Sequence, residues 1–156
     1  MRRFLYMLTV IGIFLSLGVS CGVMPSARYL AETFREQYGI DAVIFSPGIP
    51  EGERGYVREG LFETLYGDHI GSVSDFALIL HSDGESVYEC AVMLAVSEYD
   101  AVILCDVLFE RMELIRSVAS DDTSLDGAFV KRKGRLVVMC AMPDNRRAEL
   151  IWEKIM

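Results

Sequence analysis

The sequence is poor in the residues that metal centres and catalytic sites use most. Its 156 residues include two histidines, His69 and His81, and four cysteines without a C-x-x-C pair. Zinc sites need three or four His, Cys or acidic ligands at short spacings, and a nucleophilic Ser or Cys needs a base in reach. Neither pattern occurs, nor does a glycine-rich phosphate loop. We therefore expect no metal, no cofactor and no enzymatic activity, with both histidines as ordinary surface residues.

Positive charge is also scarce. The chain has 15 Lys and Arg against 23 Asp and Glu. Two of the basic residues stand in the first 20 residues, so the remainder has 13 basic and 23 acidic residues, a formal net charge of −10. Binding to nucleic acid requires Lys or Arg to neutralise phosphates, so we expect no nucleic-acid partner. An acidic surface instead keeps a domain hydrated and its copies apart.

The one long uncharged run stands at the start of the chain. Arg2 and Arg3 precede sixteen residues without charge, and small residues then lead to Cys21. This order is typical of a secretory signal, and the run is shorter than the roughly 20 residues of a membrane span. Its end resembles the lipobox of bacterial lipoproteins, whose cysteine receives a diacylglycerol and becomes the mature N-terminus. We predict a signal peptide at residues 1–20 and a lipid anchor at Cys21; an uncleaved anchor or a simple secretory signal are the alternatives.

Three further cysteines, Cys90, Cys105 and Cys140, stand within apolar runs. Free cysteine is often buried and packs as a small hydrophobic residue. We predict buried thiols, and keep one disulfide or one reactive thiol as alternatives.

Residues 21–156 have the length of one domain. Apolar residues recur at helical spacing in some of its segments and alternate, as in strands, in others. The patterns predict helices at residues 26–39, 56–67, 97–119 and 144–156, and strands at residues 40–46, 73–82 and 86–96 and within 128–142. Ser26, Ser97 and Asp144 are expected N-caps, and Gly39 an expected helix stop. Hairpins joined by helices predict a single α+β domain with an antiparallel sheet of about four to five strands and helices packed mainly on one face.

Over residues 56–156 the chain resembles a known family. The segments "LYG", "VSDFALIL", "VYECAVMLAV", "ERMELI" and "AFVKRKGRLVVMCA" follow one another in this order. This order is similar to the domain-of-unknown-function family 4358, lipoproteins of Firmicutes such as clostridia. Family members have an acid that opens the middle strand, an arginine in the next helix and a basic turn between the last strands, which match Glu89, Arg111 and "KRKGR" here. The resemblance implies a Gram-positive cell-surface lipoprotein, and it implies no particular activity.

Glu89 and Arg111 are the most informative pair of charges. If the helix that carries Arg111 covers the face of the sheet to which Glu89 points, the two form a bidentate ion pair. Strand alternation offers the other hypothesis, because it places Glu89 opposite Cys90, outward, where it would meet solvent or a partner.

The turn "KRKGR" concentrates Lys131, Arg132, Lys133 and Arg135 on an acidic domain. One hypothesis is a basic contact tip for anionic wall polymer or lipid headgroups. The other is a solvated turn whose lysines protect a sheet edge from pairing.

A partial calcium pattern precedes this turn. Asp122, Ser124, Asp126 and Gly127 match the first half of an EF-hand loop, but the twelfth position is Lys133 rather than a bidentate Glu. We predict a solvated turn without metal.

Together these features predict a lipid-anchored module on the outer face of the cytoplasmic membrane that binds or scaffolds. Its partner would be another envelope protein or a small ligand. The alternative is an extracellular hydrolase whose site combines distant acids such as Asp75, Glu89 and Glu63.

Overall fold

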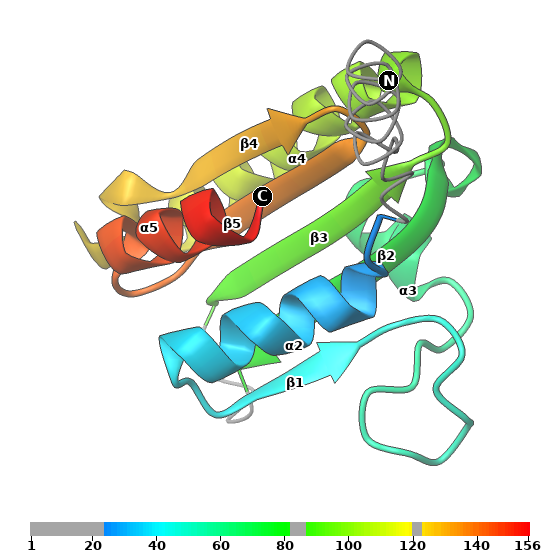
Figure 1. The fold of residues 1–156 in the computed structure, drawn as a ribbon, viewed down its shortest axis with the longest axis horizontal. Helices are drawn as coiled ribbons and strands as arrows, with labels where there is room; N and C mark the ends of the chain where they lie inside the picture. The colour runs from blue at the N-terminus through cyan, green and yellow to red at the C-terminus, as the bar shows by residue number, and fades with distance from the viewer. Residues whose placement is uncertain (1–23, 82–86, 120–122) are drawn as a thin grey trace, which may run out of the picture.

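The computed structural model describes residues 24–81, 87–119 and 123–156, which form one antiparallel sheet with helices on both faces (Figure 1). The strand order is β1-β2-β3-β5-β4. The strands are β1 (Ala42–Phe45), β2 (Val73–His81), β3 (Glu89–Ala95), β4 (Phe129–Lys133) and β5 (Leu136–Ala141). The helices are α2 (Ala27–Tyr38), α3 (Leu61–Tyr66), α4 (Glu98–Val118) and α5 (Asn145–Ile155), with short 3-10 turns η1 (Ile70–Ser72) and η2 (Thr123–Gly127). The predicted α+β class and the five-stranded antiparallel sheet are confirmed.

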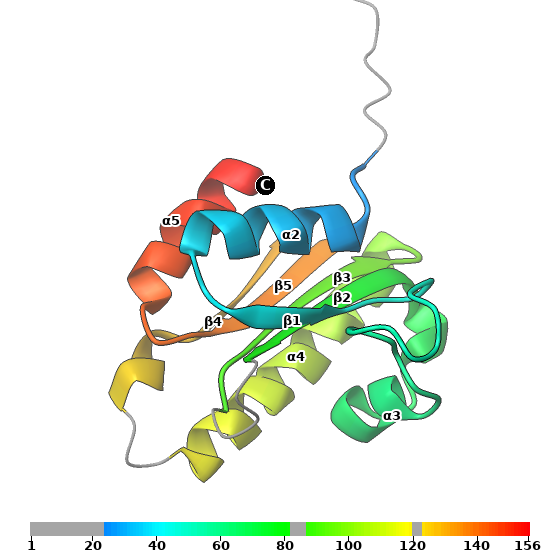
Figure 2. The same cartoon turned by 90° about the horizontal axis from the view of Figure 1, so that it is seen from below.

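The prediction that the helices gather mainly on one face is wrong. Helices α2 and α5 cover one face, and α3 and α4 cover the other (Figure 2). The reason lies in the central strands β3 and β5, whose residues are all buried. Both faces of these strands are apolar, so each face needs its own layer of helices to exclude water.

Two helices of the first face stack their aromatic rings. Phe34 of α2 and Trp152 of α5 lie with ring centroids 5.0 Å apart and nearly parallel planes, at 11°.

The expected helix caps on this face are confirmed. Ser26 accepts a hydrogen bond from the Tyr29 amide, and Gly39 takes the left-handed conformation at the end of α2. Asp144 caps α5 by accepting from the Arg147 amide.

On the second face, α4 packs an apolar seam against the sheet. Ser97 caps the helix as predicted. Leu104 is fully buried in the seam, whereas Cys105, which we expected to be buried, is only half-buried. Helix α3 begins at Leu61, five residues later than expected, because Gly60 takes a left-handed conformation that the helix cannot include.

The loop between β1 and α3 closes over one end of the edge strand β1. The Ser46 amide donates to the Gly55 carbonyl at 3.3 Å. Gly55 has φ +96°, and a Cβ there would overlap the Ile44 carbonyl oxygen. The close approach of loop to strand therefore requires glycine at this position.

Across the described part of the chain, we find no helix whose length and hydropathy suit a bilayer crossing.

Candidate functional site

Glu89 and Arg111 form a bidentate ion pair between β3 and α4. Arg111 Nη2 lies 2.6 Å from Glu89 Oε2, and Arg111 Nε donates to the same oxygen at 3.1 Å. The Tyr66 hydroxyl donates to Glu89 Oε1 at 2.6 Å. Glu89 is 2% exposed. The ion-pair hypothesis is confirmed, and the outward placement of Glu89 is wrong, because α4 covers the face that alternation had left to solvent.

Burial and the neighbouring Glu89 carboxylate shift the pKa values of both Tyr66 and Arg111. Burial, followed by the charge of Glu89, raises the pKa of Tyr66 well above its ordinary value. Burial lowers the pKa of Arg111, but the hydrogen bonds and charge of Glu89 outweigh it and raise that pKa overall. Tyr66 therefore stays neutral and Arg111 stays charged near neutral pH. Their bonds to Glu89 tie α3, α4 and β3 together.

A groove of about 410 Å³ borders this cluster between α3 and α4. Its lining combines apolar side chains with His69, Glu110 and Arg111. His81 lies at the far end of β2, where its ring meets the Tyr88 ring edge-on at 6.4 Å between centroids. The two histidines thus belong to separate parts of the fold.

The acids of the hydrolase hypothesis are not brought together. Asp75 Oδ2 accepts from the Ala27 amide at 2.7 Å and so caps the start of α2 on one face of the sheet. Glu89 points to the opposite face, toward α4. Glu63 is exposed on α3. The sheet thus separates Asp75 from Glu89, and Glu63 is exposed whereas Glu89 is buried.

The four basic residues of the β4–β5 hairpin do not form one free tip. Lys131 pairs with Glu149 at 2.8 Å and Glu153 at 3.1 Å on α5. Lys133 Nζ donates to the Met156 carbonyl. Arg135 donates to the Val96 carbonyl at 3.2 Å and Arg132 to the Gly134 carbonyl at 3.3 Å. Because side chains alternate along a strand, those of β4 point to opposite faces of the hairpin. The two lysines are bonded to residues of α5 and to the C-terminal Met156.

The residues that match part of an EF-hand loop form a 3-10 turn where the structure describes them. Asp122 lies outside the described residues, and Thr123–Gly127 forms η2. Arg116 donates to the carbonyl oxygens of Asp126 at 2.9 Å and Leu125 at 3.2 Å, so a guanidinium binds oxygens of this loop. Within residues 24–81, 87–119 and 123–156, no three His, Cys, Asp or Glu side chains are grouped as a metal site requires.

The cysteines of the domain are free thiols. Cys90 and Cys140 are buried, as predicted, and Cys105 is half-buried. Cys21, the predicted lipidation site, lies outside the described residues.

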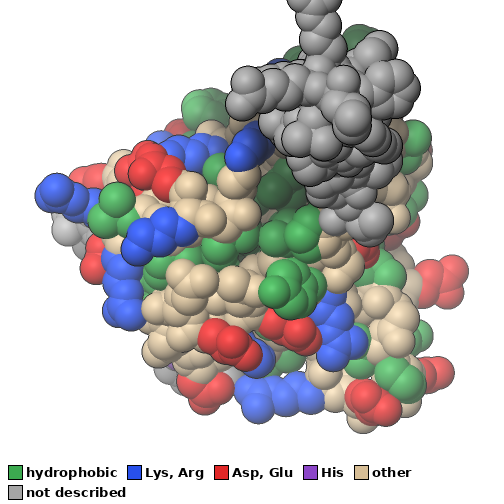
Figure 3. Space-filling view, in the orientation of Figure 1, with side chains coloured by type: hydrophobic (Ala, Val, Ile, Leu, Met, Phe, Trp, Pro, Cys, Tyr) green, Lys and Arg blue, Asp and Glu red, His purple; other side chains and the backbone are tan. Residues whose placement is uncertain are grey.

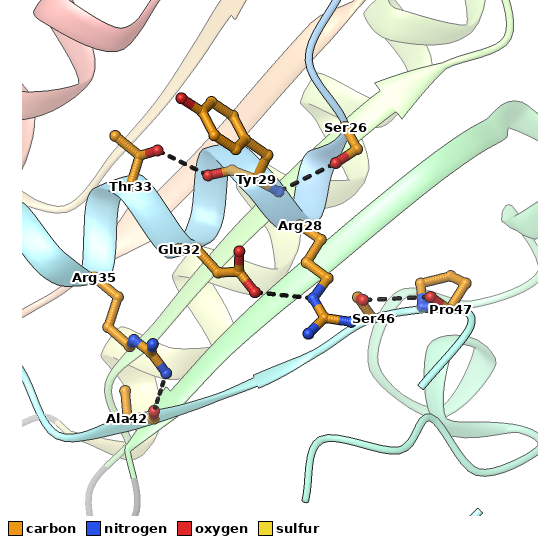
Figure 4. Close-up of polar contacts among 9 residues, drawn as sticks. All are labelled: Ser26, Arg28, Tyr29, Glu32, Thr33, Arg35, Ala42, Ser46 and Pro47. Atoms are coloured by element: carbon orange, nitrogen blue, oxygen red, sulfur yellow. Dashed lines mark hydrogen bonds and ion pairs between the residues drawn. The ribbon is translucent and has the colours of Figure 1, made fainter. Parts of the chain in front are cut away.

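The structure also forms a charged pocket that the sequence did not indicate. Arg28 and Arg35 of α2 and Arg54 of the following loop line a pocket of about 260 Å³ beside the edge strand β1, together with Glu32 and Asp41. Arg28 Nε pairs with Glu32 Oε1 at 2.9 Å, and both side chains are exposed. Figure 4 shows Arg28 and Arg35 reaching from the helix toward β1, where Arg35 Nη1 lies 3.5 Å from the Ala42 carbonyl.

The outer edge of β1 borders this pocket. The Ser46 amide and the Ile44 carbonyl face the loop at Gly55, on the side away from β2. Because backbone groups alternate sides along a strand, the amides of Ala42 and Ile44 also face away from β2. Ala42 and Ile44 are only 5% and 7% exposed, so the loop and neighbouring side chains cover most of this edge.

The pocket is a local feature of the surface. On the face that carries α2 and α5, basic and acidic side chains are interspersed (Figure 3). Three arginines and two acids give the pocket a small positive excess within an acidic domain. The seven-residue spacing of Arg28 and Arg35, two helical turns, was the signal available in the sequence; the contribution of Arg54 depends on the loop path and was not visible there.

Comparison with known proteins finds no matching family model, no matching curated protein and no matching solved structure. The resemblance to the domain-of-unknown-function family 4358 therefore stays a prediction.

Proposed function

We propose that this protein is an exported lipoprotein, anchored through Cys21, whose α+β domain is a non-catalytic binding module of the Gram-positive cell envelope. We further propose that its binding site is the pocket of Arg28, Arg35 and Arg54, and that its ligand is an acidic, extended segment of another envelope protein. The observation that carries the proposal is the convergence of three arginines on one pocket beside the edge strand β1.

The anchor is supported by the leader and by the position of α2. The basic, uncharged and small-residue segments that end at Cys21 are those of an exported lipoprotein. Helix α2 begins six residues after Cys21. Six extended residues reach at most about 20 Å, so a lipid on Cys21 would hold the start of α2, and with it Arg28, close to the membrane.

The proposal of binding rather than catalysis is supported by the contacts of two carboxylates, Glu89 and Asp75. Glu89 uses both carboxylate oxygens for Arg111 and Tyr66, and Asp75 uses one for the α2 backbone. These contacts stabilise the domain, so Glu89 and Asp75 serve the fold rather than acid–base chemistry.

The ligand class follows from the backbone and the charges together. An extended segment can add to a sheet edge through main-chain hydrogen bonds, with side-chain contacts supplying specificity. At β1 the segment would have to displace the side chains that cover Ala42 and Ile44, which are 5% and 7% exposed. Arg28 and Arg35 are separated by about 10.5 Å along the helix axis, and side chains on one side of a strand recur about every 7 Å. Carboxylates at alternate positions of such a segment can therefore reach more than one guanidinium, and charge-assisted hydrogen bonds would hold them.

The test uses the full chain in detergent and fluorescein-labelled peptides of alternating Val and Glu or alternating Val and Lys, measured by fluorescence anisotropy. We expect the Val–Glu peptide to bind and the double variant Arg35→Gln/Arg54→Gln to weaken it by at least about tenfold, since two charged hydrogen bonds exceed the 1.4 kcal/mol of one decade. Arg146→Gln, an exposed change on α5, is the matched control and should bind as wild type.

Two outcomes contradict this ligand class. Equal binding of the Val–Lys peptide, or full binding by the double variant, would show that the arginines do not recognise acids. Undiminished binding of a Val–Glu peptide with proline at its centre would show that the strand edge takes no part.

A further inference from the structure

We propose that Cys90 and Cys140 are the two halves of a disulfide cross-link that joins β3 to β5. The two residues are direct partners in the antiparallel register of these strands. Both side chains point to the face covered by α2 and α5, and both are fully buried there. The proposal concerns a covalent modification of the domain and does not depend on the arginine pocket.

The pairing is of the type in which side chains approach most closely. The Ala95 amide donates to the Arg135 carbonyl, and the Val96 amide donates to the Ser72 carbonyl. Odd-numbered residues of β3 therefore direct their backbone groups to β5, and even-numbered residues direct theirs to β2. Cys90 and Cys140 thus form a non-hydrogen-bonded pair, for which the Cα atoms lie about 4.5 Å apart. Disulfides accept Cα separations of roughly 4.4–6.8 Å.

The third thiol of the domain cannot compete for either partner. Cys105 is on α4, which packs on the opposite face of the sheet. The sheet itself separates it from Cys90 and Cys140. An intramolecular disulfide in the described domain therefore has one pairing available.

The environment explains why the link would form slowly in the folded state. Burial raises the pKa of the Cys140 thiol well above its ordinary value, and hydrogen bonding with Cys90 raises it further. A protonated, buried thiol is a poor nucleophile. Trp152 of α5 belongs to the same buried cluster. Opening of α5, or the folding process itself, would give a reagent access.

The reaction is two successive thiol–disulfide exchanges with a small-molecule or protein disulfide. The thiolate of one cysteine attacks the donor, forms a mixed disulfide and releases one donor thiolate. The second cysteine loses its proton, attacks the mixed disulfide and releases the other donor thiolate. The protein loses two protons and two electrons, and the donor disulfide is reduced to two thiols. An exported domain meets such donors more readily than a cytosolic one, so the physiological relevance of the link rests on the proposed export.

The experiment uses the full chain with Cys21→Ser and Cys105→Ser, which leaves only Cys90 and Cys140. One sample is incubated folded with oxidised glutathione, and a second is refolded from denaturant in the same redox buffer. We expect the refolded sample to lose about 2 Da, to resist alkylation after denaturation and to yield a peptide that joins Cys90 to Cys140. The melting temperature should rise by roughly 10 °C over the reduced form.

Trp152 provides a second measurement. It is the only tryptophan of the chain, and it lies in the same buried cluster as the cysteine pair. Its fluorescence should fall on oxidation and recover on reduction, and a further Cys90→Ser change should abolish both responses. Free thiols in both samples, or only mixed disulfides with glutathione, would overturn the proposal. Because the samples are purified protein, this result does not depend on whether the protein is exported.

Discussion

At the scale of single residues, the largest effect is the neutralisation of a buried charge. Glu89 would be costly at 2% exposure without partners. Arg111 and Tyr66 together supply three short hydrogen bonds from two different helices. Such a pair contributes little compared with apolar residues of the same shape, but the loss of one partner is strongly destabilising. The pair therefore specifies how α3 and α4 sit on the sheet.

We predict that Arg111→Met lowers the free energy of unfolding by about 3–5 kcal/mol, because it leaves the Glu89 carboxylate buried without its cation. The triple variant Tyr66→Phe/Glu89→Leu/Arg111→Met should recover most of this loss, because it also removes the buried hydroxyl that bonds to Glu89. Urea denaturation followed by circular dichroism measures both. The control is Glu113→Gln, which breaks an exposed pair with Arg116 and should change stability by less than about 1 kcal/mol. A similar effect of Arg111→Met and Glu113→Gln would contradict the structural role of the pair.

At the scale of elements, the edge strand β1 is shaped by the loop that follows it. This four-residue strand pairs only with β2. Gly55 brings the loop against the Ile44 carbonyl, which covers one end of the strand and leaves the arginine pocket beside the other. The position of the loop beside β1, and hence the shape of the arginine pocket, depends on this contact.

Two glycines of the loop allow a matched comparison. Gly55→Ala places a Cβ on the Ile44 carbonyl oxygen, whereas Gly52, at φ +87°, has open space around it. Gly52→Ala should lower stability by about 1–2 kcal/mol through backbone strain alone. Gly55→Ala should lower it by clearly more, because the loop must also move away from β1. Thermal melts of the two variants test this expectation, and equal melting temperatures would show that the loop does not pack closely on the strand.

At the scale of the whole molecule, the described residues form a three-layer sandwich, and helix α2 begins six residues after the predicted anchor at Cys21. The sheet is the shared middle layer, and each face has its own apolar cluster. Helix α2 is fastened to the sheet by the Asp75 cap and to α5 by the stack of Phe34 on Trp152. A lipid on Cys21, six residues before α2, would therefore hold the whole domain close to the membrane.

We predict that protein extracted from membranes of a Gram-positive host begins at Cys21 and carries a diacylglycerol on its thiol. Intact-protein and N-terminal peptide mass spectrometry measure this, and Cys21→Ser should release the chain from the membrane fraction. An intact Met1 in the native protein would refute the lipoprotein assignment, while leaving the arginine pocket and the cysteine pair to be judged by their own experiments.

Much of the fold could be predicted because it depends on local rules. The order of helices and strands follows from hydrophobic period and turn residues. Caps such as Ser26, Ser97 and Asp144 follow from side chains that satisfy free helix amides. The start of α3 was harder, because Gly60 acts through a left-handed backbone angle that composition alone does not indicate.

The candidate sites were less accessible to prediction. Alternation correctly placed Glu89 and Cys90 on opposite faces, but it could not show that α4 would cover the Glu89 side. Lys131 looked like part of a contact tip until α5 brought Glu149 and Glu153 beside it. Arg54 joins Arg28 only through the path of a loop. In each case the outcome depended on which element packs against which face.

The sequence by itself determined the elements, their order, the antiparallel hairpins and the face of the sheet to which each strand residue points, because these depend on periodicity and on neighbours along the chain. Only the tertiary structure decided that helices cover both faces, that Glu89 is buried with Arg111 and Tyr66, and that Cys90 lies opposite Cys140. These are contacts between segments far apart in sequence, and their partners are selected by the packing of the whole apolar surface.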